Sequence, residues 1–371
     1  MLVAPALLLL VSCQTSSRSA TSRPSTGTPS VGTAPTVSPA LRHLIYAAQN
    51  DGTVHVYDID AGHSLLRAIR VFACCADVRG AAAAAPTHRF YVMYNRGSEG
   101  HVAALDLNND QVVWDRILHS PGVDRGSVTP DGQTLYLPTW ESDPGSPYEL
   151  VVNAANGDVA ARIPLPARSH DTLVSLDGRR VFMETKSATA VMHVVSTATN
   201  QVDETITGYC CGGVLAPFSV NGNATRMVND VLGLAGFQVA DIATARVIAT
   251  VRFGSGSSGH GIGWTPDERE VWVDDGAAAL VHVFDMTVDP PAQTHTVSVS
   301  SPNPNWVTFS IDGRWAYVAG RKGRTDPTDV IDTGTYQRVA SLGPSEDLLE
   351  VDINGSTVTS VGNQFGVGRA G

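Results

Sequence analysis

Seven positions of the chain lie at a fixed distance from a recurring turn, and most of them carry side chains that could do chemistry. The turn has the form (Ser/Thr)-x-Asp-Gly, as in SLDG at 175–178, and each position precedes the third residue of one copy by seven residues. The seven positions are Gly80, Asp124, His170, Val214, His260, Asn305 and Asp347. Two imidazoles, two carboxylates and an amide at equivalent places of a repeat predict one ring of polar groups.

This ring is compatible with several kinds of site. As a binding site for a small molecule or a protein partner it would use, with their sequence neighbours, the residues Arg79, Asp124, Arg125, Asp171, Asn305, Trp306 and Asp347. As a metal site it would hold a divalent cation between His170, His260, Asp124 and Asp347. As a catalytic site it would use His260 or His170 as the base, with Arg125 stabilising an oxyanion. Polar groups that merely line a water-filled channel are the fourth interpretation.

The turn that defines the ring is part of a repeat. Copies occur at 129–132, 175–178, 219–222, 265–268, 310–313 and 352–355, with a degraded copy, APTH, at 85–88. Their third residues are separated by 44, 46, 44, 46, 45 and 42 residues. Each turn is followed by a short run rich in β-formers, such as RVFMET, and then by a second and a third run. A unit of about four short strands is typical of a propeller blade.

Seven copies predict an all-β fold, a seven-bladed β-propeller of four-stranded blades. The first run, LIYAAQNDG, has no turn before it, whereas the last turn, at 352–355, is followed by one more β-rich run. We therefore expect residues 346–361 to supply the inner strand that the first blade lacks. Strands from both termini would then close the ring and leave no exposed sheet edge.

The (Ser/Thr)-x-Asp-Gly turn before an aromatic and aliphatic strand resembles the YVTN-type, WD40-like seven-bladed propellers of the quinoprotein amine dehydrogenase β-chain-like and lactonase-like superfamily. The resemblance covers about residues 42–361. It implies the propeller fold, and for function it implies a range from lactonases and lyases to partners of quinone enzymes and surface proteins.

Four cysteines form two adjacent pairs, Cys74-Cys75 and Cys210-Cys211, each in a connection that enters an inner strand. Two vicinal disulfides are the first interpretation. A cross-channel pairing and a soft-metal site, such as one for copper, with His170 and His260 are the alternatives. The stretch CCADVRGAAAAA, with HVAALDLNNDQVVWD, is also similar to quinone-dependent alcohol dehydrogenases, in which adjacent cysteines form a disulfide over the cofactor. The chain differs from them in blade number and length and has no matching set of calcium ligands, so we do not expect a quinone.

The N-terminus indicates export. MLVAPALLLLVSC has a short apolar run that is typical of a secretory signal, and Leu-Val-Ser-Cys resembles a bacterial lipobox ending at Cys13. No Lys or Arg precedes Cys13, which an incorrectly assigned start codon would explain. We expect a signal peptide at 1–12, a lipid-anchored tether rich in Ser, Thr and Pro at 13–40, and the propeller at 41–371. The protein would then be anchored in the bacterial cell envelope, in the periplasm or on the outer face, or be secreted if the signal is cut elsewhere.

The charge balance narrows the partners further. The formal net charge is −11, and no basic run or basic aromatic face is present, which disfavours nucleic acid. Membrane contact is expected through the N-terminal lipid. The sequence thus favours a binding or scaffolding module with an unknown ligand, and the alternative is a lactonase-like hydrolase or lyase that uses His170 and His260.

Overall fold

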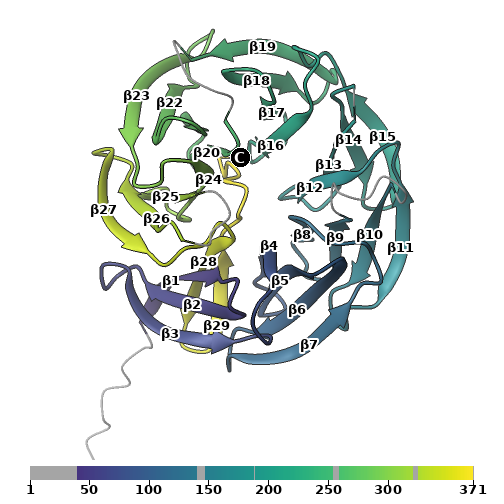
Figure 1. Cartoon of the computed structure of the whole chain (residues 1–371), viewed down its shortest axis with the longest axis vertical. Coiled ribbons are helices and arrows are strands. Elements are labelled where there is room, and N and C mark those ends of the chain that lie inside the picture. Colours follow the sequence, from purple (N-terminus) through teal and green to yellow (C-terminus); the bar gives the residue numbers. More distant parts are fainter. Residues whose placement is uncertain (1–39, 140–146, 188, 254–258, 321–324, 371) are drawn as a thin grey trace, which may run out of the picture. The chain divides into compact units, whose positions relative to one another are not determined.

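The chain forms a ring of antiparallel β-sheets. The computed structural model describes residues 40–139, 147–187, 189–253, 259–320 and 325–370. Within these residues all regular structure is β-strand, and the strands form seven sheets arranged as the blades of a propeller (Figure 1). This confirms the predicted seven-bladed β-propeller. Cys13 and the predicted signal and tether lie outside the described residues, apart from Ala40.

Six blades have four strands each, and the strand nearest the channel comes first in the chain. Blade two consists of β4 (Asp77–Ala84), β5 (Arg89–Arg96), β6 (Glu99–Asp106) and β7 (Gln111–Ile117). Blade three consists of β8 (Ser127–Val128), β9 (Thr134–Pro138), β10 (Tyr148–Asn153) and β11 (Val159–Pro164). Blade four consists of β12 (Ser169–Val174), β13 (Arg180–Thr185), β14 (Met192–Ser196) and β15 (Gln201–Ile206).

The next three blades follow the same order. Blade five consists of β16 (Leu215–Val220), β17 (Arg226–Val231), β18 (Gly236–Asp241) and β19 (Arg246–Arg252). Blade six consists of β20 (Ile262–Trp264), β21 (Glu270–Asp275), β22 (Leu280–Asp285) and β23 (Ala292–Ser298). Blade seven consists of β24 (Pro304–Phe309), β25 (Trp315–Gly320), β26 (Thr328–Asp332) and β27 (Gln337–Leu342).

Blade one joins the two ends of the chain. Its inner strand β28 (Leu348–Asn354) pairs antiparallel with β1 (Leu41–Ala48), from Leu41 opposite Asn354 to Ala47 opposite Leu348. The sheet continues outward through β2 (Thr53–Asp58) and β3 (Ser64–Arg70). The predicted closure is confirmed. The structure adds a fifth strand, β29 (Thr357–Val361), which pairs with the other side of β28.

The repeated turn links the first and second strands of a blade and holds itself together. In blade four the Ser175 hydroxyl donates to Asp177 (2.6 Å), and the Arg179 amide donates to the same carboxylate oxygen (3.0 Å). Gly178 adopts a φ of 71°, which a glycine reaches without a steric penalty. This hydrogen bonding explains why Ser or Thr, Asp and Gly recur at this spacing.

The hydrophobic core lies between the faces of neighbouring blades. Tyr46 of blade one packs in the same cluster as Phe90 and Val92 of blade two, and Trp272 of blade six clusters with Val307 of blade seven. The outermost strands are mostly exposed; in β3 only Ile69 is buried. Because each blade packs against a neighbouring blade on both of its faces, the ends of the inner strands have fixed positions around the central channel.

The residues after β29, 362–370, form a tail that runs into this channel. In Figure 1 the yellow C-terminal end lies near the centre of the ring. Phe365 is 1 % exposed and packs against Phe218 and Trp306, with ring centroids 5.9 and 5.7 Å away. The Gly366 carbonyl accepts hydrogen bonds from the Trp264 amide (2.8 Å) and the Ser219 hydroxyl (2.7 Å). A cavity of about 30 Å³, large enough to hold a water molecule, remains beside the tail.

Candidate functional site

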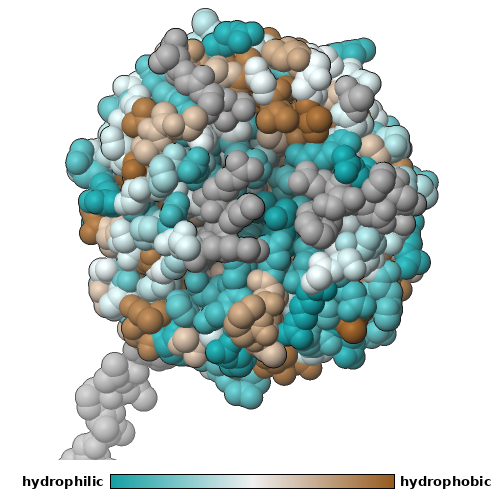
Figure 2. Space-filling model, viewed as in Figure 1, coloured by the Kyte–Doolittle hydropathy of each residue, from teal (hydrophilic) through white to brown (hydrophobic). Residues whose placement is uncertain are grey.

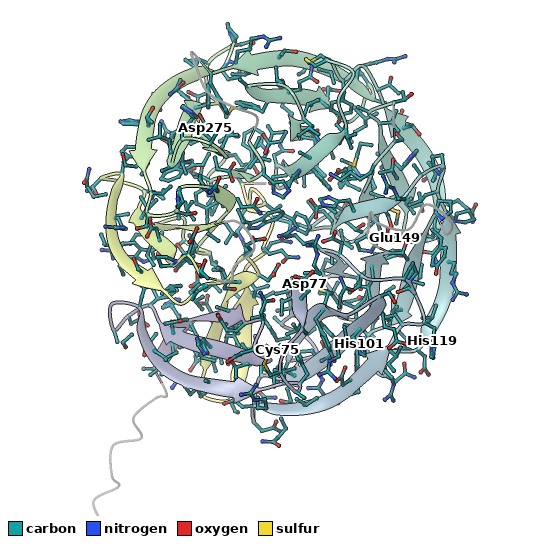
Figure 3. All side chains as sticks on the ribbon, viewed as in Figure 1. Cys75, Asp77, His101, His119, Glu149 and Asp275 are labelled. Atoms are coloured by element: carbon teal, nitrogen blue, oxygen red, sulfur yellow. A yellow bond between two sulfur atoms is a disulfide. The ribbon has the colours of Figure 1, made fainter. Side chains whose placement is uncertain are left out.

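The predicted ring lies at one end of the channel, which we call the mouth: the end where the inner strands begin and the second strands finish. Figures 1–3 view this face, and Figure 3 shows Asp77, two residues before Arg79, toward the centre of the ring. Figure 2 shows hydrophilic side chains around the centre of the same face. Gly80 and Val214 occupy their ring positions without adding polar side chains.

Arg125 is the hub of the mouth. Its side chain is 3 % exposed, and its Nη2 donates to Glu346 Oε2 at 2.5 Å. Its other nitrogens lie 3.6 Å from Asp347, 3.9 Å from Asp171 and 4.0 Å from Asp124. The guanidinium carbon stands 4.0 Å from the centroid of the Trp306 ring, close enough for a cation–π interaction. The structure therefore brings together, through one cation, residues of blades three, four, seven and one.

Asp124 is held by two arginines. Arg79 grips it with two hydrogen bonds, of 3.1 and 2.7 Å, in the bidentate geometry that favours an ionised carboxylate. Burial raises the pKa of Asp124, but Arg79 and His170 outweigh burial and hold that pKa below its usual range. Asp124 is therefore a permanent anion at the mouth.

His170 faces carboxylates on several sides. Its Nδ1 lies 3.2 Å from both Asp171 and Glu184, and its Nε2 lies 3.7 Å from Asp124. Burial lowers the pKa of His170, but Asp171 and the other two carboxylates outweigh burial and raise it to about 10. His170 is thus an imidazolium at neutral pH.

His260 is in the opposite state. Burial, together with the positive charges of Arg125 and His170, lowers the pKa of His260 to about 3. Its Nδ1 lies 3.2 Å from the backbone oxygen of Asn305, so the neutral ring carries its proton on Nδ1 and donates it there. Nε2 then keeps its lone pair, and no described residue donates a hydrogen bond to it. The two imidazoles stand edge to face, with ring centroids 6.4 Å apart.

A second row of carboxylates escaped the sequence prediction. Glu184, Asp230 and Asp274 are each the fifth residue of the second strand in blades four, five and six, within RVFME, RMVND and EVWVD. All three are fully buried. The signal was present in the sequence, since an acid recurs at the same position of three second strands, but the ring positions alone do not reveal it.

These carboxylates differ in charge. Lys186 lies 2.8 Å from Glu184. Burial, with the nearby Asp274 and Glu184, raises the pKa of Asp230 well above its usual value, and within the described part of the chain neither of its oxygens accepts a hydrogen bond. Burial also raises the pKa of Asp274 to about 8, although the His260 amide donates a hydrogen bond to it at 2.8 Å. Burial raises the pKa of Asp347 to about 7, although the positive charge of Arg125 acts to lower it.

The tail forms the floor of the mouth. Trp306, which carries Arg125 on one face, donates its indole N–H to the Gln364 carbonyl at 2.6 Å. The Gln364 side chain in turn accepts from the Ala81 amide (2.9 Å) and donates to the Gly126 carbonyl (3.2 Å). The C-terminal tail therefore closes the channel directly below the mouth.

Both cysteine pairs lie on loops of this face. The structure contains a disulfide between Cys74 and Cys75, before β4, and another between Cys210 and Cys211, before β16. Figure 3 shows Cys75 further from the centre than Asp77. Cys74, Cys75 and Cys211 are exposed and Cys210 is half-buried.

The predicted metal site is only partly assembled. Asp124, His170 and Asp171 each offer a ligand atom, all within 4.8 Å of one another. However, Arg79 occupies both oxygens of Asp124, and Arg125 lies within 4.0 Å of both aspartates. His260 faces Asn305, and Asp347 faces Arg125. Two guanidinium groups already supply the positive charge that a metal ion would bring, so this donor set does not fit a divalent cation.

Comparison with known proteins supports the fold. No family model matches the sequence. No curated protein matches it either. Among solved structures, a chain of hydrazine synthase from Kuenenia stuttgartiensis is similar, with a TM-score of 0.60 and 15 % identity over 77 % of this chain and 95 % of that one. The β-propeller domain of Cps50 (Swd1) from Myceliophteria thermophila is also similar, with a TM-score of 0.61 and 9 % identity over 75 % of this chain and 89 % of that one. At these identities the likeness shows the WD40-like propeller fold alone, and the YVTN type remains a prediction.

Proposed function

We propose that the protein is a binding module that takes a small molecule carrying an anionic group and a hydroxyl donor, such as a sugar acid, into the mouth of the propeller. The observation that carries the proposal is the array of buried charges around Arg125. Buried ion pairs gain little stability over apolar packing, so such an array indicates a functional site. The tail supports the proposal because it closes the channel below the mouth, so a ligand at the mouth would contact the charged side chains without passing through the ring.

The accessible groups at the mouth indicate the chemistry of the ligand. The Arg79 and Lys186 side chains are 22 % and 12 % exposed, and Asp77 is a partly exposed carboxylate beside Arg79. Asp124, Asp171 and Glu184 lie beneath them, fully buried. An anionic group would face the two cations, and a ligand hydroxyl would donate to Nε2 of the half-buried His260.

The two histidines favour binding over acid–base catalysis. A general base works best with a pKa near the working pH, and so does a general acid. A pKa of about 3 makes His260 a weak proton acceptor, and a pKa of about 10 makes His170 a weak proton donor. The lactonase-like alternative can be tested directly. It would be supported if the wild type hydrolysed lactones and His260→Ala did not.

Calorimetric titration with D-gluconate, D-glucuronate and D-glucose tests the proposed function. We expect both acids to bind and glucose to bind more weakly. Because a charge-assisted hydrogen bond contributes about 1.5–3 kcal/mol, Arg79→Gln should weaken acid binding by about 10-fold or more. His55→Gln, on β2 and outside the mouth, is the matched control. Equal binding of glucose and the acids, or equal affinity in Arg79→Gln, would refute the charge assignment.

We further propose that the domain works outside the cytoplasm, tethered through Cys13. The two vicinal disulfides support this proposal, because disulfides persist in oxidising compartments. Metabolic labelling with a palmitate analogue should label the wild type and not Cys13→Ala. Equal labelling, or none in either, would contradict lipid anchoring.

A further inference from the structure

A second group of metal-ligating side chains lies away from the mouth, where the two ends of the chain meet. His43 of β1 stands directly opposite Asp352 of β28, and Glu350 lies two residues before Asp352 on the same strand. This pairing is near the opposite end of the channel, beside the turn at 352–355. The group, which we call the clasp, joins the strands that close the ring.

The three ligand atoms of the clasp converge on one point. Nδ1 of His43 lies 2.8 Å from an oxygen of Asp352 and 3.4 Å from an oxygen of Glu350, and all three atoms lie within 4.8 Å of one another. A tetrahedral Zn²⁺ with bonds of about 2.0–2.2 Å holds its ligand atoms roughly 3.3 Å apart. The observed spacing therefore needs small adjustments to accept such an ion.

Two carboxylates of the clasp face a single imidazole nitrogen. Nδ1 carries at most one proton, yet it faces oxygens of two carboxylates. The Glu350 side chain is 3 % exposed, and its second oxygen accepts the Ile311 amide at 2.5 Å, which fixes the carboxylate with its first oxygen toward His43. A divalent ion would satisfy both carboxylates and the imidazole together.

The surroundings also suit a cation. Asp60 and Asp312 lie near the clasp, and Arg369 of the tail is the guanidinium close to both carboxylates. Asp124 at the mouth pairs with Arg79, whereas within the described residues neither carboxylate of the clasp forms an ion pair with an arginine. The His43 side chain is 36 % exposed, which gives an ion a path from solvent.

We propose that His43, Glu350 and Asp352 bind a divalent transition-metal ion such as Zn²⁺, with water completing the coordination, and that this ion fastens β1 to β28. The ion would bind the closed ring and not the unfolded chain, so it would stabilise the propeller. This site is independent of ligand binding at the mouth.

Metal titration of the full-length, chelator-treated protein tests the clasp. We expect one Zn²⁺ per chain by calorimetry, a visible d–d spectrum when Co²⁺ replaces Zn²⁺, and a rise of about 5 °C in Tm at 100-fold excess over Kd. His43→Gln should weaken binding by at least about 10-fold, and Asp352→Asn should do the same, whereas His55→Gln should not. No binding to the wild type, or unchanged binding in both clasp variants, would overturn the proposal.

Discussion

Arg125 shows at the scale of one residue why the mouth is built for function. It is a buried cation that faces four carboxylates and an indole ring. Removing one member of such a network leaves uncompensated charge in a place that water does not reach. The network therefore makes the mouth rigid, at the cost of making it sensitive to single substitutions.

Arg125→Met should lower the free energy of unfolding by about 3–5 kcal/mol, because the carboxylates around it lose their shared counter-ion. Urea unfolding followed by tryptophan fluorescence measures the loss. Arg67→Met, which breaks the half-exposed pair with Asp110, should cost less than about 1 kcal/mol. Equal losses in the two variants would mean that Arg125 is not a charge hub.

Asp274→Asn tests the charge state of the second row. The folded pKa of about 8 lies above the usual 3.8, so the native state keeps a proton that the unfolded chain releases. The contribution of Asp274 to stability is therefore full below about pH 4 and is lost as the pH rises to about 8. The amide mimics the neutral acid, so the variant should gain stability relative to the wild type over this window. A stability difference that stays constant from pH 4 to pH 8 would show that Asp274 is ionised.

The ring residues could be found from the sequence because each lies seven residues before the Asp position of the repeated turn. That turn is recognisable because its hydrogen bonds require the same residue types in each copy. The sequence did not reveal what each residue does. The raised pKa of His170 depends first on its neighbour Asp171 but also on Glu184 and Asp124. The lowered pKa of His260 depends on burial and on Arg125. Apart from Asp171, these charged partners come from other strands or blades. The pairing of the cysteines was likewise open, because all three pairings were compatible with their spacing.

At the scale of elements, the tail is the least predictable part. The position of β28 could be predicted because the turn at 352–355 matches six other copies, each of which follows an inner strand. The following stretch, GNQFGVGRAG, has no period of two or 3.6, and its buried contacts, through Phe365 and Val367, are all non-local. Gly366 has a φ of 56°, and a Cβ at this position would lie 3.0 Å from the Cα of Gly263. The tail therefore needs a glycine here to pack in the channel, and no local sequence pattern indicates this need.

Phe365→Ala should cost about 3–5 kcal/mol of stability, because a fully buried ring is removed from between Phe218 and Trp306. Chemical unfolding measures the change. Val339→Ala, at a position that is 52 % exposed on β27, should stay within about 0.5 kcal/mol of the wild type. A similarly small effect of Phe365→Ala would mean that the tail does not occupy the channel in solution.

At the scale of the whole molecule, the ring depends on pairing its two ends. β28 lies between β1 and β29 and also contacts the inner strands β4 and β24. Without it, β1 would present an open edge, and open edges promote aggregation. The fold class could be predicted because it follows from counting repeats, whereas the depth and floor of the mouth follow from the tail.

Truncation after Leu342 should abolish cooperative unfolding and yield aggregates, because it removes β28, β29 and the tail together. Truncation after Val361 is the matched control, since it keeps the closed ring and should leave a folded monomer of lower stability. Size-exclusion chromatography and thermal melts distinguish the two. A monomeric, cooperatively melting chain that ends at Leu342 would contradict closure by β28.

The central claim, that the mouth receives a small acid, is tested most directly by NMR of histidine side chains labelled with ¹³C and ¹⁵N. On addition of D-gluconate, the account predicts that the ring signals of His260 shift, that His170 remains an imidazolium, and that His43 at the clasp does not move. If gluconate and glucuronate leave His260 unmoved, or shift His43 in its place, the assignment of the mouth as the binding site is wrong.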